Sequence, residues 1–364
     1  MMLQEMKKLQ TILSVIILSS LSLNAQQTWY KGNTHMHTDF SDGDSPIKQV
    51  VDWYHDHGYN FLSITDHNKT IIPLNHLSRA GLRDDFIMII GNEITSSVHF
   101  TALGVEENFS VKTIVKDYDE GRLKGYDLPG PDSSKIGHSQ ILINGMLDQG
   151  ALVFINHPNF SLGISAEEML ELKGVTAIEL ANAHPSVYNY GNDRHIPVED
   201  KWDHLLTNGM KVFAVGSDDE HHIQKWGPDA ANPGRSWIMV EADELKHENI
   251  LEAIGRGDFY TSTGVELSKF KADNNNILLE IDKKKTLKNL RKGLGVGRIA
   301  ENGEPGFIIE LIGKNGNIIE SAKGEKALFY FDGIDKYLRV RASFCRLVDG
   351  KYEYFYAWSQ PVFE

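Results

Sequence analysis

The chain has 364 residues, a formal net charge of −13 and one cysteine, Cys345. This acidic balance argues against binding of nucleic acid or of an anionic membrane through charge. It still allows a small anionic substrate, because bound divalent metals reverse the local field. A single cysteine excludes an internal disulfide and a thiolate zinc cluster. Any metal ion must therefore be held by carboxylates and by some of the 15 histidines.

Residues 1–25 have the pattern of a secretory signal peptide. Lys7 and Lys8 form a basic start, residues 11–23 are mostly apolar, and Ala25 is a small residue suited to signal peptidase. The alternative is an uncleaved anchor helix, but the apolar run is short for a membrane span. We therefore expect export to the periplasm or the extracellular space, with no membrane insertion after cleavage.

Residues 26–265 are predicted to form one α/β domain, because short apolar runs alternate with amphipathic stretches. The predicted strands are 31–38, 61–65, 86–94, 100–105, 152–156, 177–180, 212–215 and 236–240. The predicted helices are 45–57, 139–149, 165–172, 198–208 and 244–255. Alternation of this kind indicates a largely parallel sheet, and with about seven such units we expect the sheet to close into a barrel.

Residues 266–364 lack the alternation of strands and helices and are predicted to form a small antiparallel β-sandwich. The predicted strands are 267–281, 306–313, 327–331, 337–344 and 352–357, separated by Gly, Asn and Asp turns, and few helical periods occur there. The aromatic stretch 352–358 alternates and is most simply a half-buried strand. Sugar binding is its alternative interpretation.

His35 and His37 are the first candidates for a metal site. Residues two apart on a strand point to the same face, so the two imidazoles can chelate one ion. Alone, the pair is explained as well by two polar residues at a strand end. Further metal-binding side chains follow other predicted strands, namely Asp42, His67, Glu93, His99, His157 and Asp218. Such residues at strand ends are expected of an active site and are costly to bury unpaired.

This ordered set of motifs, over about residues 29–264, resembles the PHP (polymerase and histidinol phosphatase) superfamily of metal-dependent phosphoesterases. Residues 257–264 and the Trp358-Ser359-Gln360-Pro361 ending resemble a branch that carries a C-terminal β domain and is named for a carbaryl hydrolase. The resemblance implies a distorted seven-stranded (β/α) barrel with two or three divalent ions, which can be zinc, manganese or iron.

The resemblance also implies which residues hold each metal. The first ion is assigned to His35, His37, Glu93 and Asp218, the second to Glu93, His99 and His157, and the third to Asp42 and His67. The family completes the third site with a histidine two residues after the aspartate of its Gly-Ser-Asp motif, and here Glu220 has that position. Either Glu220 replaces the imidazole, or a bulge brings in His221, or only two ions bind.

Hydrolysis by a metal-bridging hydroxide follows from such a centre. Arg235 is the candidate clamp for phosphoryl oxygens, with a surface ion pair as the alternative. His195 and His221 are candidates to protonate a leaving group. Asp66, Glu179 and Asn182 are expected to support the ligands from behind.

The predicted function is a metal-dependent hydrolase, foremost a phosphoesterase acting on a small phosphate ester. The alternatives are a hydrolase of amides, carbamates or carboxylic esters with the same centre, and a module that binds metal or anion without turnover.

Overall fold

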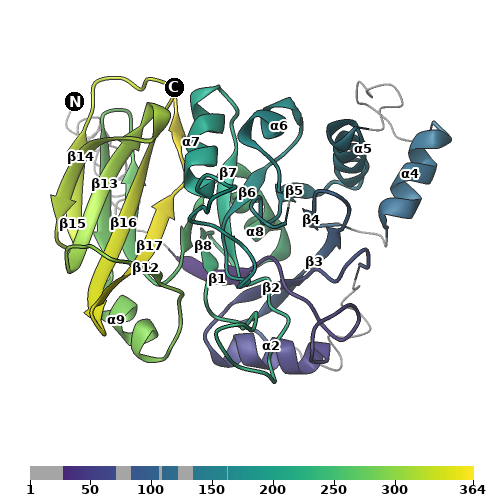
Figure 1. Ribbon diagram of the computed structural model, residues 1–364, viewed down its shortest axis with the longest axis horizontal. Coiled ribbons are helices and arrows are strands. Elements are labelled where there is room, and N and C mark those ends of the chain that lie inside the picture. The colour runs from purple at the N-terminus through teal and green to yellow at the C-terminus, as the bar shows by residue number, and fades with distance from the viewer. Residues whose placement is uncertain (1–27, 71–82, 106–108, 122–133, 162) are drawn as a thin grey trace, which may run out of the picture.

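The computed structural model describes residues 28–70, 83–105, 109–121, 134–161 and 163–364. An α/β part and a C-terminal β part lie side by side (Figure 1), and strand β9 connects the sheets of the two parts. The predicted signal peptide, residues 1–25, lies outside the described residues.

Eight of the nine described strands of the α/β part follow the predicted apolar runs, and β9 is a strand that was not predicted. The strands are β1 (Trp29–Asn33), β2 (Phe61–Ile64), β3 (Ile87–Ile94), β4 (Phe100–Leu103), β5 (Leu152–Ile155), β6 (Ala177–Asn182), β7 (Phe213–Ser217), β8 (Trp237–Glu241) and β9 (Phe259–Ser262). Their order in the sheet is β9-β8-β1-β2-β3-β4-β5-β6-β7. The sheet is less parallel than predicted, because β4 runs antiparallel to β3 and β5, and β8 runs antiparallel to β1 and β9.

The expected closure into a barrel is wrong, because this sheet is open between β7 and β1. Strand β8 pairs with β1 and occupies the edge that β7 would need. The backbone segments that follow β1 and β7 do contact each other. Asp219 N donates to His35 O (3.0 Å), and His37 N donates to Glu220 O (2.8 Å). The sheet is therefore drawn together at one end, where β1, β2 and β3 terminate.

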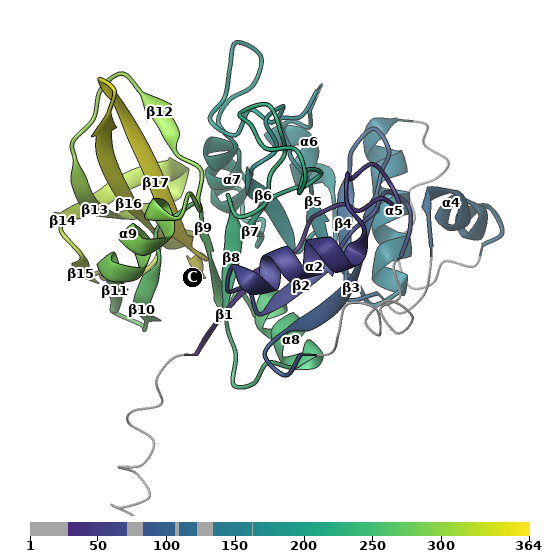
Figure 2. The same cartoon turned by 90° about the horizontal axis from the view of Figure 1, so that it is seen from below.

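The described helices of this part surround the sheet (Figure 2), and all but α8 begin at a side-chain cap or a proline. They are α2 (Ile47–Asp56), α4 (Val111–Asp119), α5 (Lys135–Asp148), α6 (Ala166–Glu171), α7 (Val198–Thr207) and α8 (His247–Arg256). The predicted capping box of α6 is confirmed, since Ser165 Oγ accepts from Glu168 N and Glu168 Oε2 accepts from Ser165 N. Ser134 caps α5, which begins four residues earlier than predicted.

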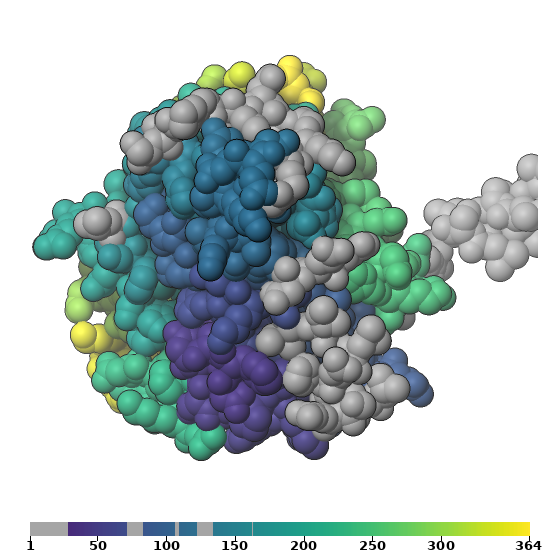
Figure 3. Space-filling model, turned by 90° about the vertical axis from the view of Figure 1, so that its right-hand side faces the viewer, coloured from purple at the N-terminus to yellow at the C-terminus, as the bar shows by residue number. Residues whose placement is uncertain are grey.

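Helices α2 and α4 form surface at the end of the molecule remote from the C-terminal strands (Figure 3). None of the helices in the described ranges combines the length and the apolar character that crossing a membrane requires.

The C-terminal part consists of two antiparallel sheets packed face to face, as predicted. One sheet contains β10 (Leu267–Ala272), β11 (Asn276–Ile281) and β15 (Lys326–Tyr330), and the other contains β12 (Arg298–Ala300), β13 (Gly306–Gly313), β14 (Asn317–Lys323), β16 (Tyr337–Val348), β17 (Lys351–Ser359) and β18 (Val362–Phe363). Their buried faces share one core that includes Leu279, Ile309 and Val340. Because β17 also pairs with β9, the second sheet continues into the α/β part.

Helix α9 (Lys283–Arg291) is an element that the sequence analysis did not predict. Asp282 caps it by accepting from Lys285 N at 2.8 Å, and Thr286 and Leu290 are its buried residues. With so few apolar side chains, a lysine-rich helix of this length gives only a weak periodic signal.

A buried ion pair joins the two parts of the molecule. Arg339 of β16 binds Asp203 of α7 through two parallel contacts, Nε to Oδ1 (2.8 Å) and Nη2 to Oδ2 (2.7 Å). Tyr337 donates to the same carboxylate at 2.7 Å. Both partners of the ion pair are nearly inaccessible to solvent, so each depends on the other for compensation of its charge.

We expect Arg339→Leu to destabilise the protein by about 3–5 kcal/mol, because it leaves a buried carboxylate without its cation. Urea unfolding measures the change. Arg346→Leu is the matched control, since the Arg346–Glu353 pair is partly exposed and should contribute less than about 1 kcal/mol. Equal effects of the two substitutions would contradict this account of the junction.

Candidate metal centre

Histidines and carboxylates from separate segments meet at the edge where β1, β2 and β3 end. His35 and His37 follow β1, Glu93 lies near the end of β3, and His157 follows β5. Because β4 is antiparallel to β3, its first residue lies at this same edge, and His99 directly precedes it. The strand directions therefore bring these side chains together.

The first group consists of His35, His37, Glu93 and Asp219, all of them buried. Asp219 Oδ1 lies 3.3 Å from His35 Nε2 and 3.2 Å from His37 Nε2, and the two nitrogens are 3.2 Å apart. Each nitrogen is also 3.4 Å from an oxygen of Glu93. Four ligands placed tetrahedrally about 2.0–2.1 Å from a zinc ion are about 3.3–3.4 Å apart. The group therefore has the size of a coordination shell.

Glu93 is the residue whose surroundings most clearly call for a cation. Its side chain is 1% exposed, and Oε2 accepts no hydrogen bond from the described residues. His67 Nδ1 lies 2.8 Å from this oxygen, but that nitrogen has its hydrogen-bond contact with Thr95 Oγ1 at 2.6 Å. A buried carboxylate oxygen without a donor costs free energy. A divalent cation between Glu93 and the histidines removes that cost, so the residues fit a metal.

The second group shares Glu93 with the first. Glu93 Oε1 lies 3.1 Å from His99 Nδ1 and 3.3 Å from His157 Nε2. Asn156 Nδ2 donates to the same oxygen at 3.0 Å and holds the carboxylate in place. His157 has a φ of +26°, an uncommon value of the kind found at functional sites. Because its two oxygens face different histidines, Glu93 is placed to bridge two ions.

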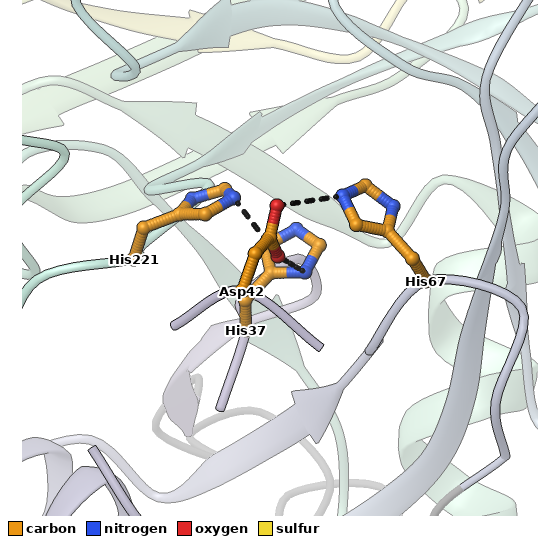
Figure 4. A group of neighbouring side chains, drawn as sticks. All are labelled: His37, Asp42, His67 and His221. Carbon is orange, nitrogen blue, oxygen red and sulfur yellow. Dashed lines mark ion pairs between the residues drawn. The ribbon is translucent and has the colours of Figure 1, made fainter. Parts of the chain in front are cut away.

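The third group consists of Asp42, His67 and His221 and is drawn in Figure 4 together with His37. Asp42 Oδ2 lies 3.2 Å from His67 Nε2, and Asp42 Oδ1 lies 3.4 Å from His221 Nε2. His37 also approaches Asp42, at 3.5 Å through Nδ1. If His37 Nε2 binds an ion in the first group, Nδ1 carries the proton and supports Asp42 by donation.

Electrostatics at this third group favours a bound positive charge. Burial opposes protonation of His67, but the close carboxylates of Asp42 and Glu93 outweigh it and raise the pKa of His67 to about 10. The carboxylates thus attract a proton where no ion is bound, and a metal ion can take its place. The Asp42 side chain is 52% exposed, which places this group at the mouth of the site.

The structure corrects one assigned ligand: Asp219, and not Asp218, lies beside His35 and His37. Asp218 turns to the other side of the chain. Its carboxylate accepts backbone N–H donors of residues 234–236 at 2.7–2.8 Å and the Tyr54 hydroxyl at 2.9 Å. Ser217 Oγ donates to Glu179 Oε1 at 2.5 Å, and Asp219, two residues beyond the end of β7 and with a φ of +47°, lies on the side of His35.

Glu220 is likewise not in the cluster, and His221 has the expected place of the third-site histidine. His221 lies two positions after Asp219, which is one residue later than the pattern counted from Asp218 of Gly216-Ser217-Asp218. Burial, with the charges of Asp218 and Asp44 next to it, raises the pKa of Glu220 well above its usual range. This carboxyl therefore favours the neutral form, unlike a ligand.

The predicted role of Arg235 as a phosphoryl clamp is not supported by its contacts. Its guanidinium donates to the backbone oxygens of Ala230 (2.9 Å) and Gly227 (3.0 Å) and to Asn232 Oδ1 (2.8 Å). Arg235 therefore fixes the loop between β7 and β8. His195 lies outside the three groups as well, with Nε2 3.1 Å from the Ser161 backbone oxygen.

The buried Glu179 and Asn182 contact the candidate ligands from behind. Glu179 Oε1 lies 2.7 Å from His35 Nδ1, and Glu179 Oε2 accepts from His157 N at 2.7 Å and from Asn182 at 2.9 Å. Asn182 also donates to Asp219 Oδ2 at 3.0 Å. A proton on His35 Nδ1 leaves Nε2 free to bind metal.

Asp66 holds the turn that carries Asp42. It accepts from Thr38 N (2.8 Å), Thr38 Oγ1 (2.7 Å) and Ser41 Oγ (2.6 Å).

His184 is a residue near the centre that no sequence pattern singled out. Its ring lies 5.4 Å from the ring of His221 and 6.4 Å from that of Phe160, and burial lowers its pKa. Ser186 N donates to His184 Nδ1 at 3.2 Å. The neutral ring therefore carries its proton on Nε2 and can donate it to a bound molecule.

A cavity of about 290 Å³ opens beside His99 and His157. Phe160, Ile164 and the segment 96–98 form other parts of its wall, and none of its described lining residues is a lysine or an arginine. The cavity is adjacent to the second group and large enough for part of a small substrate.

No family model and no curated protein matches this chain. Among solved structures, it is similar to a two-domain protein from Bacteroides vulgatus, predicted to contain a PHP-like metal-dependent phosphoesterase. That match has 16% identity and a TM-score of 0.44, and it covers 90% of this chain and 95% of that one.

Two further similar structures cover 55% of this chain each. One, from Bifidobacterium adolescentis, is provisionally described as a metal-dependent phosphoesterase (14% identity, 91% of that chain, TM-score 0.35). The other is an amidohydrolase from Chromobacterium violaceum with bound sulfate and no metal (15% identity, 93% of that chain, TM-score 0.32). All three TM-scores are below 0.5.

Proposed function

We propose that this chain is a metal-dependent hydrolase, and specifically a phosphoesterase that acts on a small phosphate ester. The observation that carries the proposal is Glu93, whose two oxygens face different histidines inside one buried cluster. Two divalent ions sharing such a carboxylate supply a nucleophilic hydroxide and stabilise the attacking and leaving oxygens. Zinc, manganese and iron all suit a mixture of imidazole and carboxylate ligands.

The residues that would hold the ions follow from the three groups. They are His35, His37, Glu93 and Asp219 for the first ion, Glu93, His99 and His157 for the second, and Asp42, His67 and His221 for a third. Most of these side chains are buried, whereas the third group is exposed to solvent at Asp42. A substrate anion therefore reaches the centre from the side of Asp42.

The cavity of about 290 Å³ beside His99 is the proposed seat of the part of the substrate that does not react. The Phe160 ring, 5.1 Å from the ring of His157, forms an apolar wall next to the second ion position. His184 is the proposed hydrogen-bond donor to a substrate or leaving oxygen, through the proton on Nε2.

We expect His184→Ala to lower kcat by about 10²-fold, the usual contribution of a positioned proton donor, while the metal content per chain stays unchanged. Steady-state kinetics and elemental analysis of the same preparation give both values. His184→Gln, which retains a donor, should recover part of kcat. An unchanged kcat in His184→Ala would remove this residue from the mechanism.

A second candidate is hydrolysis of a carboxylic ester, amide or carbamate by the same ions. One observation favours it: among the described residues, no lysine or arginine lines the cavity beside His99 and His157, and Arg235 is engaged elsewhere. A neutral substrate needs no such cation. In this case the ions polarise a carbonyl group instead of a phosphoryl group.

The proposal is tested by turnover of aryl phosphate monoesters, aryl phosphate diesters and aryl carboxylic esters, with added manganese, zinc or iron. The expected result is metal-dependent release of phosphate or of the aryl alcohol from a phosphate ester, which EDTA abolishes and metal restores. Turnover of carboxylic esters alone would favour the second candidate. Fewer than two ions per chain after reconstitution, without turnover of any ester, would leave only a binding module.

Export is proposed from residues 1–25 alone. N-terminal sequencing of the protein recovered from cells should begin at Gln26, in the periplasm or the medium. Recovery with Met1 intact, in the membrane fraction, would support the anchor alternative.

A further inference from the structure

A second cavity, of about 100 Å³, lies where the α/β part meets the C-terminal strands. Residues of β6, α7, β12, β16 and β17 line it, so it lies at the α7–β17 side of the junction (Figure 1). None of the candidate metal ligands is among its lining residues. It is therefore a separate site.

Aromatic rings form the walls of this cavity. The rings of Tyr356 and Trp358, both from β17, are 5.0 Å apart, and the Tyr190 ring lies 6.3 Å from Tyr356. Tyr190 is 36% exposed and stands at the mouth, whereas Tyr356 and Trp358 are buried. The guanidinium carbon of Arg298 lies 5.3 Å from the centre of the Tyr190 ring. The mouth thus combines apolar ring faces with a cation.

Polar groups at this cavity are left available for a ligand. Trp358 is 2% exposed, and its indole N–H has no hydrogen-bond partner among the described residues. An unsatisfied buried N–H costs about 1–3 kcal/mol, which a ligand oxygen would recover. Both Arg298 and Asp200 line the cavity. Within the described residues neither forms an ion pair, and Arg298 hydrogen-bonds the Tyr356 hydroxyl at the cavity wall.

The rest of the wall is held rigid. Arg341 Nη1 donates to Glu199 at 2.9 Å and Arg341 Nε donates to Glu310 at 2.9 Å. Asn189 Nδ2 donates to the Asn182 backbone oxygen at 2.6 Å. A preformed wall of this kind binds a ligand without a large ordering cost.

We propose that this cavity binds a sugar ring, either as a free monosaccharide or as the end unit of a saccharide. A pyranose presents C–H faces that pack on tyrosine rings, and hydroxyl groups that both accept and donate hydrogen bonds. Here the Trp358 N–H and Arg298 are the donors, and Asp200 is the acceptor. An ordered water needs about 10–15 Å³ of such space, so about 100 Å³ suits one small polar molecule.

The experiment is saturation-transfer NMR on the full chain treated with EDTA, which separates this cavity from any sugar held by metal ions. The probes are glucose, galactose, mannose, N-acetylglucosamine and galacturonic acid, with glycine and glutamate as amino-acid probes. At least one sugar should bind saturably. A disaccharide of that sugar then distinguishes a free monosaccharide from the end unit of a saccharide. If saturation is transferred to only one of its two rings, the cavity binds an end unit.

Binding of that sugar should weaken by about tenfold or more in Tyr190→Ala and in Arg298→Ala, which remove partly or fully exposed side chains of the mouth. Trp358→Phe, which deletes the donor and leaves an aromatic ring, should weaken it as well. Tyr352→Ala, on the same strand but outside the cavity, is the matched control and should bind normally. Absence of saturable transfer from every sugar, binding of amino acids alone, or unchanged affinity in both mouth variants would overturn the proposal.

Discussion

Glu93→Gln should lower kcat for every hydrolysed ester by about 10³-fold or more and reduce the metal content by at least one ion per chain. Glutamine keeps the size of the side chain and can still accept from Asn156, but it offers one neutral oxygen where two charged oxygens face different histidines. The shared ligand between the first two groups is therefore lost. Kinetics and elemental analysis on one preparation measure both effects.

His55→Ala is the control for Glu93→Gln. His55 lies on the outer side of α2, with Nε2 3.1 Å from the exposed Asp85, and its removal should leave turnover and metal content unchanged. Full activity of Glu93→Gln with two ions bound would contradict the bridging role of this carboxylate.

Asp218→Asn and Asp219→Asn should have opposite effects, although the residues are neighbours. Asp219→Asn should lower kcat by about 10²-fold or more, because it removes a charged ligand next to His35 and His37. Its effect on unfolding should be small. Asp218→Asn should keep the metals but destabilise the fold by about 2–4 kcal/mol, because the amide group then faces buried N–H and O–H donors.

Circular dichroism in urea gives the stability of each variant, and elemental analysis gives its metal content. We expect Asp219→Asn to keep its stability and lose metal. We expect Asp218→Asn to keep its metal and lose stability. Loss of metal from Asp218→Asn with normal stability would restore the assignment made from the sequence.

The strands of the fold could be predicted because their apolar runs are local features. Closure of the sheet could not, since it depends on which strand takes the second edge of β1, and β8 occupies that edge. That competition involves residues about 200 positions apart in the chain and leaves no periodic signal in either segment.

The candidate site could be predicted from spacing where two ligands lie two residues apart, as His35 and His37 do just after β1. The prediction failed by one residue at Asp218 and Asp219, because consecutive acids leave open which of them faces inward. Strand alternation does not decide between them, since β7 ends at Ser217 and Asp219 has a φ of +47°. His184 had no neighbouring motif, and its place next to His221 follows only from the folded chain.

The most direct test of the central claim is anomalous diffraction from crystals of the full chain grown with manganese or zinc, with data collected at the absorption edge of the metal. We expect one peak among His35, His37, Glu93 and Asp219, and a second among Glu93, His99 and His157. A third at Asp42, His67 and His221 would complete the centre. No peak within bonding distance of Glu93 would contradict the proposed metal centre and the hydrolase function derived from it.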